Sequence, residues 1–171
     1  MMGRLPAVLK SLNLIKAVVM LARIEKREIY DAVNAALEVR IADVKDLINR
    51  YQEAANTEEK NTAGDKHEVT KAQMQWEVEK ANRQLSNLLE MRQIMLRVDP
   101  VGVTETVSTG SVVKTDQGYF FVAIAMGRVM VDHEPVMCIS GVSPIGKIMF
   151  GKKAGDTAEF NDKKYLIEKV Y

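Results

Sequence analysis

Residues 41–55 read IADVKDLINRYQEAA, and residues 74–88 read MQWEVEKANRQLSNL. In each stretch the apolar side chains recur at alternating spacings of three and four residues, which places them on one face of a helix. The first set is Ile41, Val44, Ile48, Tyr51 and Ala55, and the second set is Met74, Val78, Ala81, Leu85 and Leu88. The two stretches therefore predict two long helices whose apolar faces pack against each other.

The segment between these stretches, residues 56–64, reads NTEEKNTAG and is polar and typical of a turn. It predicts that the helices fold back as an antiparallel coiled-coil hairpin with this segment at the tip. A helix from Glu25 to Asn56 would extend about 45 Å. A rod of that length could reach into a narrow opening in a partner.

The composition changes at residues 99–102, which read DPVG. Proline disfavours helix in the residue before it, so a helix should end near Val98 and a new unit should begin. We expect three parts: an N-terminal extension over 1–24, the hairpin over 25–98 and a β-rich domain over 99–171. Met20 is an alternative translation start, because the residues before it do not share the pattern of the helix that follows.

Short β-type runs separated by turn signals fill the second half of the chain. The expected strands are 111–115, 119–125, 129–132, 136–139 and 164–170. Ser143 as a cap, Pro144 at the first helical position and Gly151 after the end predict a short helix over 143–150. The sequence as a whole predicts an α+β fold.

The composition of the chain argues against a DNA-binding protein, a disulfide-stabilised protein and a membrane protein. Of 171 residues, 24 are basic and 23 acidic, a formal net charge of +1, which provides no overall basic field for DNA and disfavours sequence-specific DNA binding. Cys138 is the single cysteine, so no intramolecular disulfide can form, and a reducing cytoplasmic setting is expected. The longest uncharged stretch near the N-terminus, residues 17–22, is far shorter than the roughly 20 residues of a membrane span, so no membrane association is expected.

Residues 143–156 read SPIGKIMFGKKAGD and resemble the signature of the C-terminal domain of the bacterial Gre transcript-cleavage factors. That family places an antiparallel coiled coil before this domain, the same order as here. The resemblance implies an FKBP-like C-terminal domain that binds RNA polymerase. The residues of the signature that it assigns to polymerase binding are Ser143, Pro144, Ile145, Lys147, Lys152 and Lys153.

At the expected tip, residues 64–68 read GDKHE and are similar to the family's Gly-Asp-x-x-Glu, whose two acids are functional. The resemblance implies that Asp65 and Glu68 act as catalytic carboxylates, sharing Mg²⁺ with the polymerase active centre to cleave backtracked RNA at its 3′ end. Two carboxylates are too few to hold magnesium alone. We therefore expect no stably bound cofactor and no enzymatic turnover by the factor itself. We also expect the protein to be a monomer.

Three alternatives remain open from the sequence. Asp65 and Glu68 also fit a helix capping box. Lys66 and His67 depart from the family's usual Leu-Ser pair, which leaves a non-cleaving regulator or inhibitor of polymerase as an alternative function. A peptidyl-prolyl isomerase is disfavoured, because an FKBP-type pocket needs a tryptophan at its floor and Trp76, the single tryptophan, precedes the expected domain.

Overall fold

The computed structural model describes residues 7–60 and 65–171, with side chains described over 26–56 and 72–171. The chain divides into two compact units. One contains Asn34–Leu96, and the other combines Met1–Val33 with Arg97–Tyr171. Each unit is described separately below.

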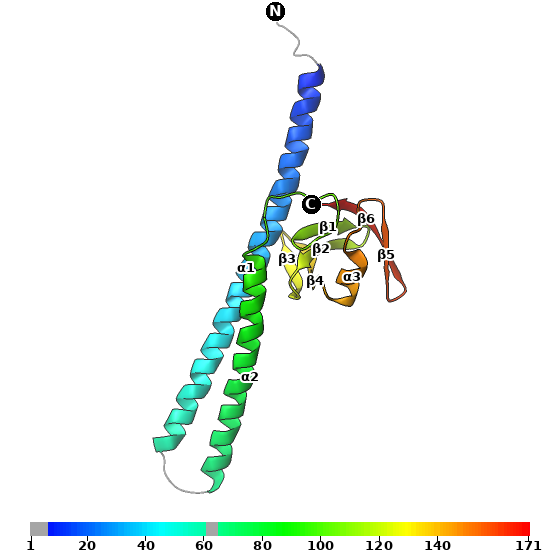
Figure 1. Cartoon of the computed structure of the whole chain (residues 1–171). Coiled ribbons are helices and arrows are strands. Elements are labelled where there is room, and N and C mark those ends of the chain that lie inside the picture. Colours follow the sequence, from blue (N-terminus) through cyan, green and yellow to red (C-terminus); the bar gives the residue numbers. More distant parts are fainter. Residues whose placement is uncertain (1–6, 61–64) are drawn as a thin grey trace, which may run out of the picture. The chain divides into compact units, whose positions relative to one another are not determined.

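The unit Asn34–Leu96 is a helical hairpin formed from α1 (Ala7–Lys60) and α2 (Asp65–Met95) (Figure 1). The helices are linked by an ion pair between Arg92 and Glu38, with 3.7 Å between Nη1 and Oε2. The antiparallel hairpin predicted from the apolar spacing is confirmed.

The buried side chains of the hairpin follow the predicted faces. The residues buried along the two helices of this unit are Leu37, Ile41, Val44, Ile48, Ala81, Leu88 and Met95. The remaining predicted positions, Tyr51, Ala55, Met74, Val78 and Leu85, are half-buried. A continuous apolar seam therefore stabilises the rod.

Helix α1 is longer than the sequence predicted at both ends. It starts at Ala7 instead of near Glu25, and it continues to Lys60 instead of ending at Asn56. Residues 57–60 read TEEK, and glutamate and lysine are good helix formers, which outweighs the turn tendency of Asn56 and Thr57.

The second unit contains one mixed six-stranded sheet in the order β3-β4-β2-β1-β6-β5. Its strands are β1 (Ser111–Thr115), β2 (Gly118–Ala123), β3 (Gly127–Val131), β4 (Glu134–Ser140), β5 (Thr157–Phe160) and β6 (Lys163–Val170). All neighbouring pairs are antiparallel except β2 and β4, which run parallel. The predicted α+β class is confirmed.

The short helix α3 (Pro144–Met149) follows the parallel strand β4 and lies beside β5 (Figure 1). Met149 is fully buried in the core, and Ile145 and Ile148 pack against the same cluster. The buried residues of that cluster are Val107, Val113, Phe120, Val122, Ile139, Met149, Ala158, Ile167 and Val170. Cys138 on β4 is buried, as the sequence predicted.

Lys26 fixes the chain after the hairpin to α1. Lys26 is buried as a residue, and its ammonium group donates a hydrogen bond to the carbonyl oxygen of Gly102. Burial lowers the pKa of Lys26, and the nearby Asp99 carboxylate opposes that shift. Asp99 also accepts a hydrogen bond from the amide of Val101 at 2.9 Å, so the segment that the sequence marked as a boundary is held by specific contacts.

Candidate functional site

The signature segment forms α3 through Ser143. Its hydroxyl accepts a hydrogen bond from the Gly146 amide at 3.1 Å and donates to the Ser140 carbonyl oxygen at 2.6 Å. Pro144 follows at the first turn, where a missing N–H costs nothing. The Ser143 side chain therefore caps the helix and ties it to the end of β4.

Gly146 allows α3 to approach β4 closely. A Cβ atom at this position would lie 2.1 Å from the carbonyl oxygen of Ser140, a backbone atom that cannot move aside cheaply. Ile145 is half-buried against the core. The Ser-Pro-Ile-Gly part of the signature consequently has a structural role in packing α3 within this domain.

The outer side of this segment exposes two apolar side chains that sequence reasoning did not single out. Val142 is 77% exposed and Phe150 is 50% exposed. Pro144, Lys147 and Lys153 are also exposed, whereas Lys152 is half-buried. We name the exposed set the α3 face: Val142, Pro144, Lys147, Phe150 and Lys153.

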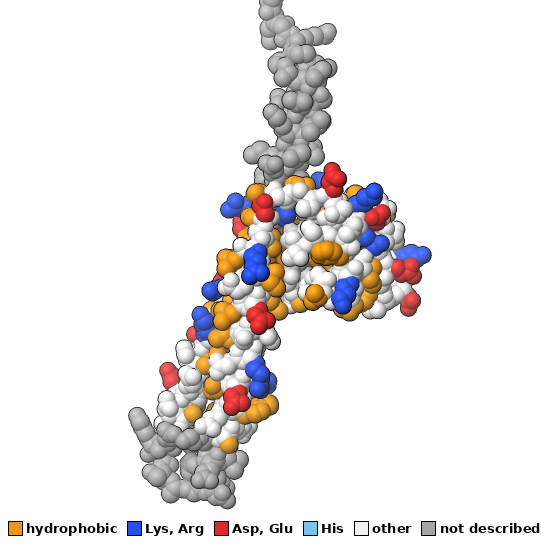
Figure 2. All heavy atoms as spheres, viewed as in Figure 1, with side chains coloured by type: hydrophobic (Ala, Val, Ile, Leu, Met, Phe, Trp, Pro, Cys, Tyr) orange, Lys and Arg blue, Asp and Glu red, His pale blue; other side chains and the backbone are white. Residues whose placement is uncertain are grey.

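Backbone contacts hold the end of the α3 face in place. The amide of Gly151 donates to the Val107 carbonyl oxygen, and the amide of Val107 donates to that of Lys152. The Asp156 carboxylate accepts from the Lys153 amide at 2.9 Å. Figure 2 shows hydrophobic and basic side chains exposed together in the region of α3. Aromatic side chains are enriched at protein interfaces, so the exposed Phe150 makes this ordered surface suited to binding a protein partner.

The two carboxylates expected at the hairpin tip belong to the start of α2, which begins at Asp65 and includes Glu68. Their side chains, and those of Lys66 and His67, lie outside the described residues, as does Gly64. The assignment of Asp65 and Glu68 as functional acids stays a prediction. Among the side chains that the structure does describe, no three histidine, cysteine or acidic groups are placed to hold a metal ion.

Trp76 lies on α2 and is exposed, with the Lys80 ammonium 5.3 Å from its ring centroid. It belongs to the hairpin unit and not to the sheet. In the described part of the chain, no helix has the length and apolar character needed to cross a membrane.

No protein-family model and no curated protein matches this chain. A search of solved structures finds similarity to GreA factor homolog 1 (Gfh1) of Thermus thermophilus. The identity is 15% and the TM-score 0.32, with 81% of this chain and 94% of that chain covered.

Proposed function

We propose that this protein is a Gre-type transcription factor that binds RNA polymerase through the α3 face and inserts the hairpin tip into its secondary channel. The observation that carries the proposal is the α3 face itself. The signature segment forms an ordered helix and turn. On its surface this segment exposes the apolar side chains of Val142 and Phe150 together with two lysines. We propose that the factor acts in the cytoplasm.

At the tip, we propose that Asp65 and Glu68 supply oxygen ligands to a Mg²⁺ ion in the polymerase active centre. Asp65 and Glu68 are three residues apart at the start of α2, a spacing at which residues of a helix are neighbours. A metal ion held there would lower the pKa of its bound water and stabilise the attacked phosphodiester of a backtracked RNA. The hydrolytic centre would belong to the polymerase complex and not to this chain alone.

The departure of Lys66 and His67 from the family pattern supports a second candidate function. In that case the factor occupies the same channel but changes pausing or initiation, or inhibits polymerase, without promoting cleavage. Both functions use the same docking surface. They differ only in whether the hairpin tip, once in the secondary channel, promotes RNA cleavage.

A cleavage assay distinguishes the two functions. The purified protein is added with Mg²⁺ to a stalled, backtracked polymerase complex, and the length of the RNA is followed. We expect shortened RNA with the wild type and none with Asp65→Asn or Glu68→Gln. Glu90→Gln is the matched control, because Glu90 is an exposed acid on the same helix, about 33 Å further along it than Glu68.

Polymerase binding is measured in the same preparations by co-sedimentation. Retained binding without any RNA shortening by the wild type would favour the non-cleaving regulator. Absence of binding would reject both candidate functions. Binding that Val142→Ser does not weaken relative to Leu166→Ser, a change at another exposed apolar residue of the same unit, would reject the α3 face as the docking surface.

A further inference from the structure

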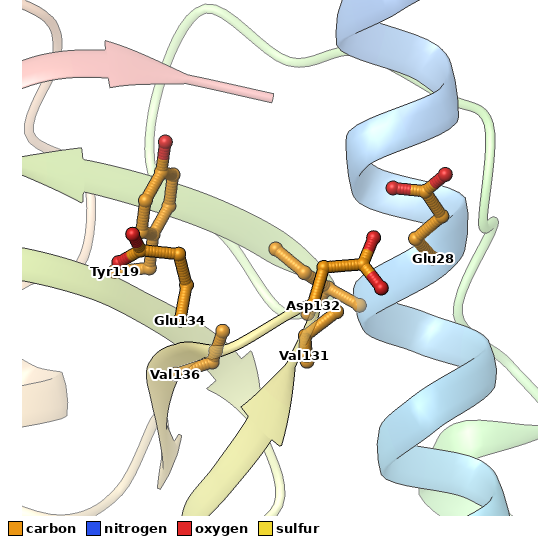
Figure 3. Close-up of a pocket in the computed structure, with 7 residues that line it drawn as sticks. Glu28, Tyr119, Val131, Asp132, Glu134 and Val136 are labelled. Carbon is orange, nitrogen blue, oxygen red and sulfur yellow. The ribbon is translucent and has the colours of Figure 1, made fainter.

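A small cavity lies away from the α3 face, where α1 meets the strands of its own compact unit. Its volume is about 210 Å³. Figure 3 shows the residues around it, which come from α1, from β2 and from the β3–β4 hairpin. The lining residues are Glu28, Ile29, Tyr119, Val131, Asp132, Glu134 and Val136.

The cavity combines an apolar floor with an acidic rim. Ile29 and Val136 are buried, and Val131 and Tyr119 are half-buried. The three charged lining residues are all acids, and all three are exposed: Glu28, Asp132 and Glu134. No ion pair within the described part of the chain joins any of them to a basic side chain. The rim therefore carries a formal charge of −3, which has no partner among these residues.

Lys114, a basic residue close to the lining residue Tyr119, has an acidic partner of its own. The Lys114 ammonium lies 5.8 Å from the ring centroid of Tyr119, and it also lies 3.8 Å from the carboxylate of Glu168. His133 sits between two of the rim acids in the chain but does not line the cavity. The negative charge of the rim is consequently left for an external cation.

The rim acids are held by ordered backbone. Asp132 and His133 form the two-residue turn between β3 and β4, with φ of 46° and 70°, and Val131 pairs with Glu134 across it. Positive φ at both positions is the mark of a type I′ hairpin turn, which fixes the direction of the flanking side chains. Figure 3 shows the Asp132 carboxylate toward Glu28 of α1, and the Glu134 carboxylate on the opposite side, beside Tyr119. The turn and the helix therefore define the backbone positions from which the three acids project.

We infer that this cavity binds an arginine side chain of a partner protein. The aliphatic stem of arginine packs on apolar surface while its guanidinium binds carboxylates with several donors at once. The volume is below the roughly 300 Å³ at which small-molecule sites begin, so a single side chain fits better than a cofactor. Phosphate-bearing partners such as nucleic acids are repelled by the rim. The inference does not depend on the proposed function.

The test uses the full-length protein and a short peptide, acetyl-Gly-Arg-Gly-amide, followed by NMR chemical shifts of the β3–β4 amides. The neutral comparison is the same peptide with citrulline, which keeps the shape of arginine but not its charge. We expect saturable shifts with the arginine peptide and none with the citrulline peptide. The combined variant Glu28→Gln, Asp132→Asn and Glu134→Gln should weaken binding by about tenfold or more.

The matched control neutralises three exposed acids elsewhere in the same unit, with the changes Glu105→Gln, Glu159→Gln and Asp162→Asn. It alters the net charge equally and should change the affinity less than about twofold. Equal loss in both combined variants would overturn the inference, because a general charge effect would then explain the binding. So would binding of the citrulline peptide, absence of saturable binding, or tighter binding of spermidine than of the arginine peptide.

Discussion

Gly146 lies where α3 approaches β4 closely, so a substitution there tests the packing beneath the α3 face. In Gly146→Ala the new methyl group would meet the Ser140 carbonyl oxygen at 2.1 Å, so α3 must move. We expect the free energy of unfolding to fall by about 2 kcal/mol or more. Gly141→Ala is the control, because its Cβ would meet the Phe150 ring at an ordinary 3.6 Å. Urea unfolding followed by circular dichroism measures both variants, and equal losses would contradict the close approach.

Lys26 gives the second prediction at the scale of a residue. Its folded pKa lies below the ordinary value of 10.5, mainly because of burial. Between the lowered pKa and 10.5, the unfolded chain binds a proton that the folded chain has released. The free energy of unfolding should therefore rise with pH across that window and lose this contribution as the pH falls through the folded pKa.

Urea titrations of the wild type and Lys26→Met from neutral pH to 10.5 isolate this effect. The stability of the wild type relative to the variant should increase with pH, since the variant lacks the titrating group. Asp99→Asn removes the charge that raises the Lys26 pKa and should move the increase to lower pH. A difference that stays constant across the whole range would show that Lys26 does not titrate as described.

Among the elements, the hairpin seam is the feature whose contribution is easiest to measure. Leu37 and Val39 are two residues apart on α1, with exposed fractions of 0% and 60%. Leu37→Ala should lower the free energy of unfolding by about 3 kcal/mol, because it removes buried methyl groups and leaves a cavity. Val39→Ala should change it by less than about 0.5 kcal/mol. Helical circular dichroism during urea unfolding reports both, and similar values would mean that the seam does not stabilise the rod.

The same contrast explains which elements the sequence could predict. The seam was predictable because a regular helix repeats its buried positions, and β1 was predicted with its observed bounds of Ser111–Thr115. Strand β5 was not predicted, because Thr157–Phe160 is too short for an alternating pattern to stand out. The parallel pairing of β2 with β4 depends on contacts between distant residues and leaves no local signal.

The candidate sites also contain features that the local sequence could predict and features that only the folded structure reveals. Ser143 and Pro144 could be predicted as a helix start because capping is local. The exposure of Val142 and Phe150 could not, because it depends on what the rest of the domain leaves uncovered. The acidic cavity joins Glu28 to a hairpin about a hundred residues later in the chain, so only the folded structure brings its members together. The domain limits expected from composition stay predictions.

For the whole molecule, the proposed function predicts that the α3 face and the hairpin tip affect different kinetic quantities. Docking through the α3 face would set how much factor is needed, whereas Asp65 and Glu68 would set the rate once the factor is bound. This separation follows because a residue that contributes only binding changes the half-saturating concentration, and one that acts on the reacting groups changes the maximal rate. RNA shortening in a backtracked polymerase complex, measured over a range of factor concentrations, yields both quantities.

We expect Val142→Ser to raise the half-saturating concentration about fivefold or more while leaving the maximal rate unchanged, because a hydroxyl replaces apolar surface that docking would bury. Asp65→Asn should lower the maximal rate at least about tenfold with an unchanged half-saturating concentration, because a ligand to the metal is weakened. The double variant should combine the higher half-saturating concentration with the lower maximal rate, if the α3 face and the hairpin tip act independently. Loss of maximal rate in Val142→Ser would contradict this division of roles, because added factor would then fail to compensate for a weakened docking surface.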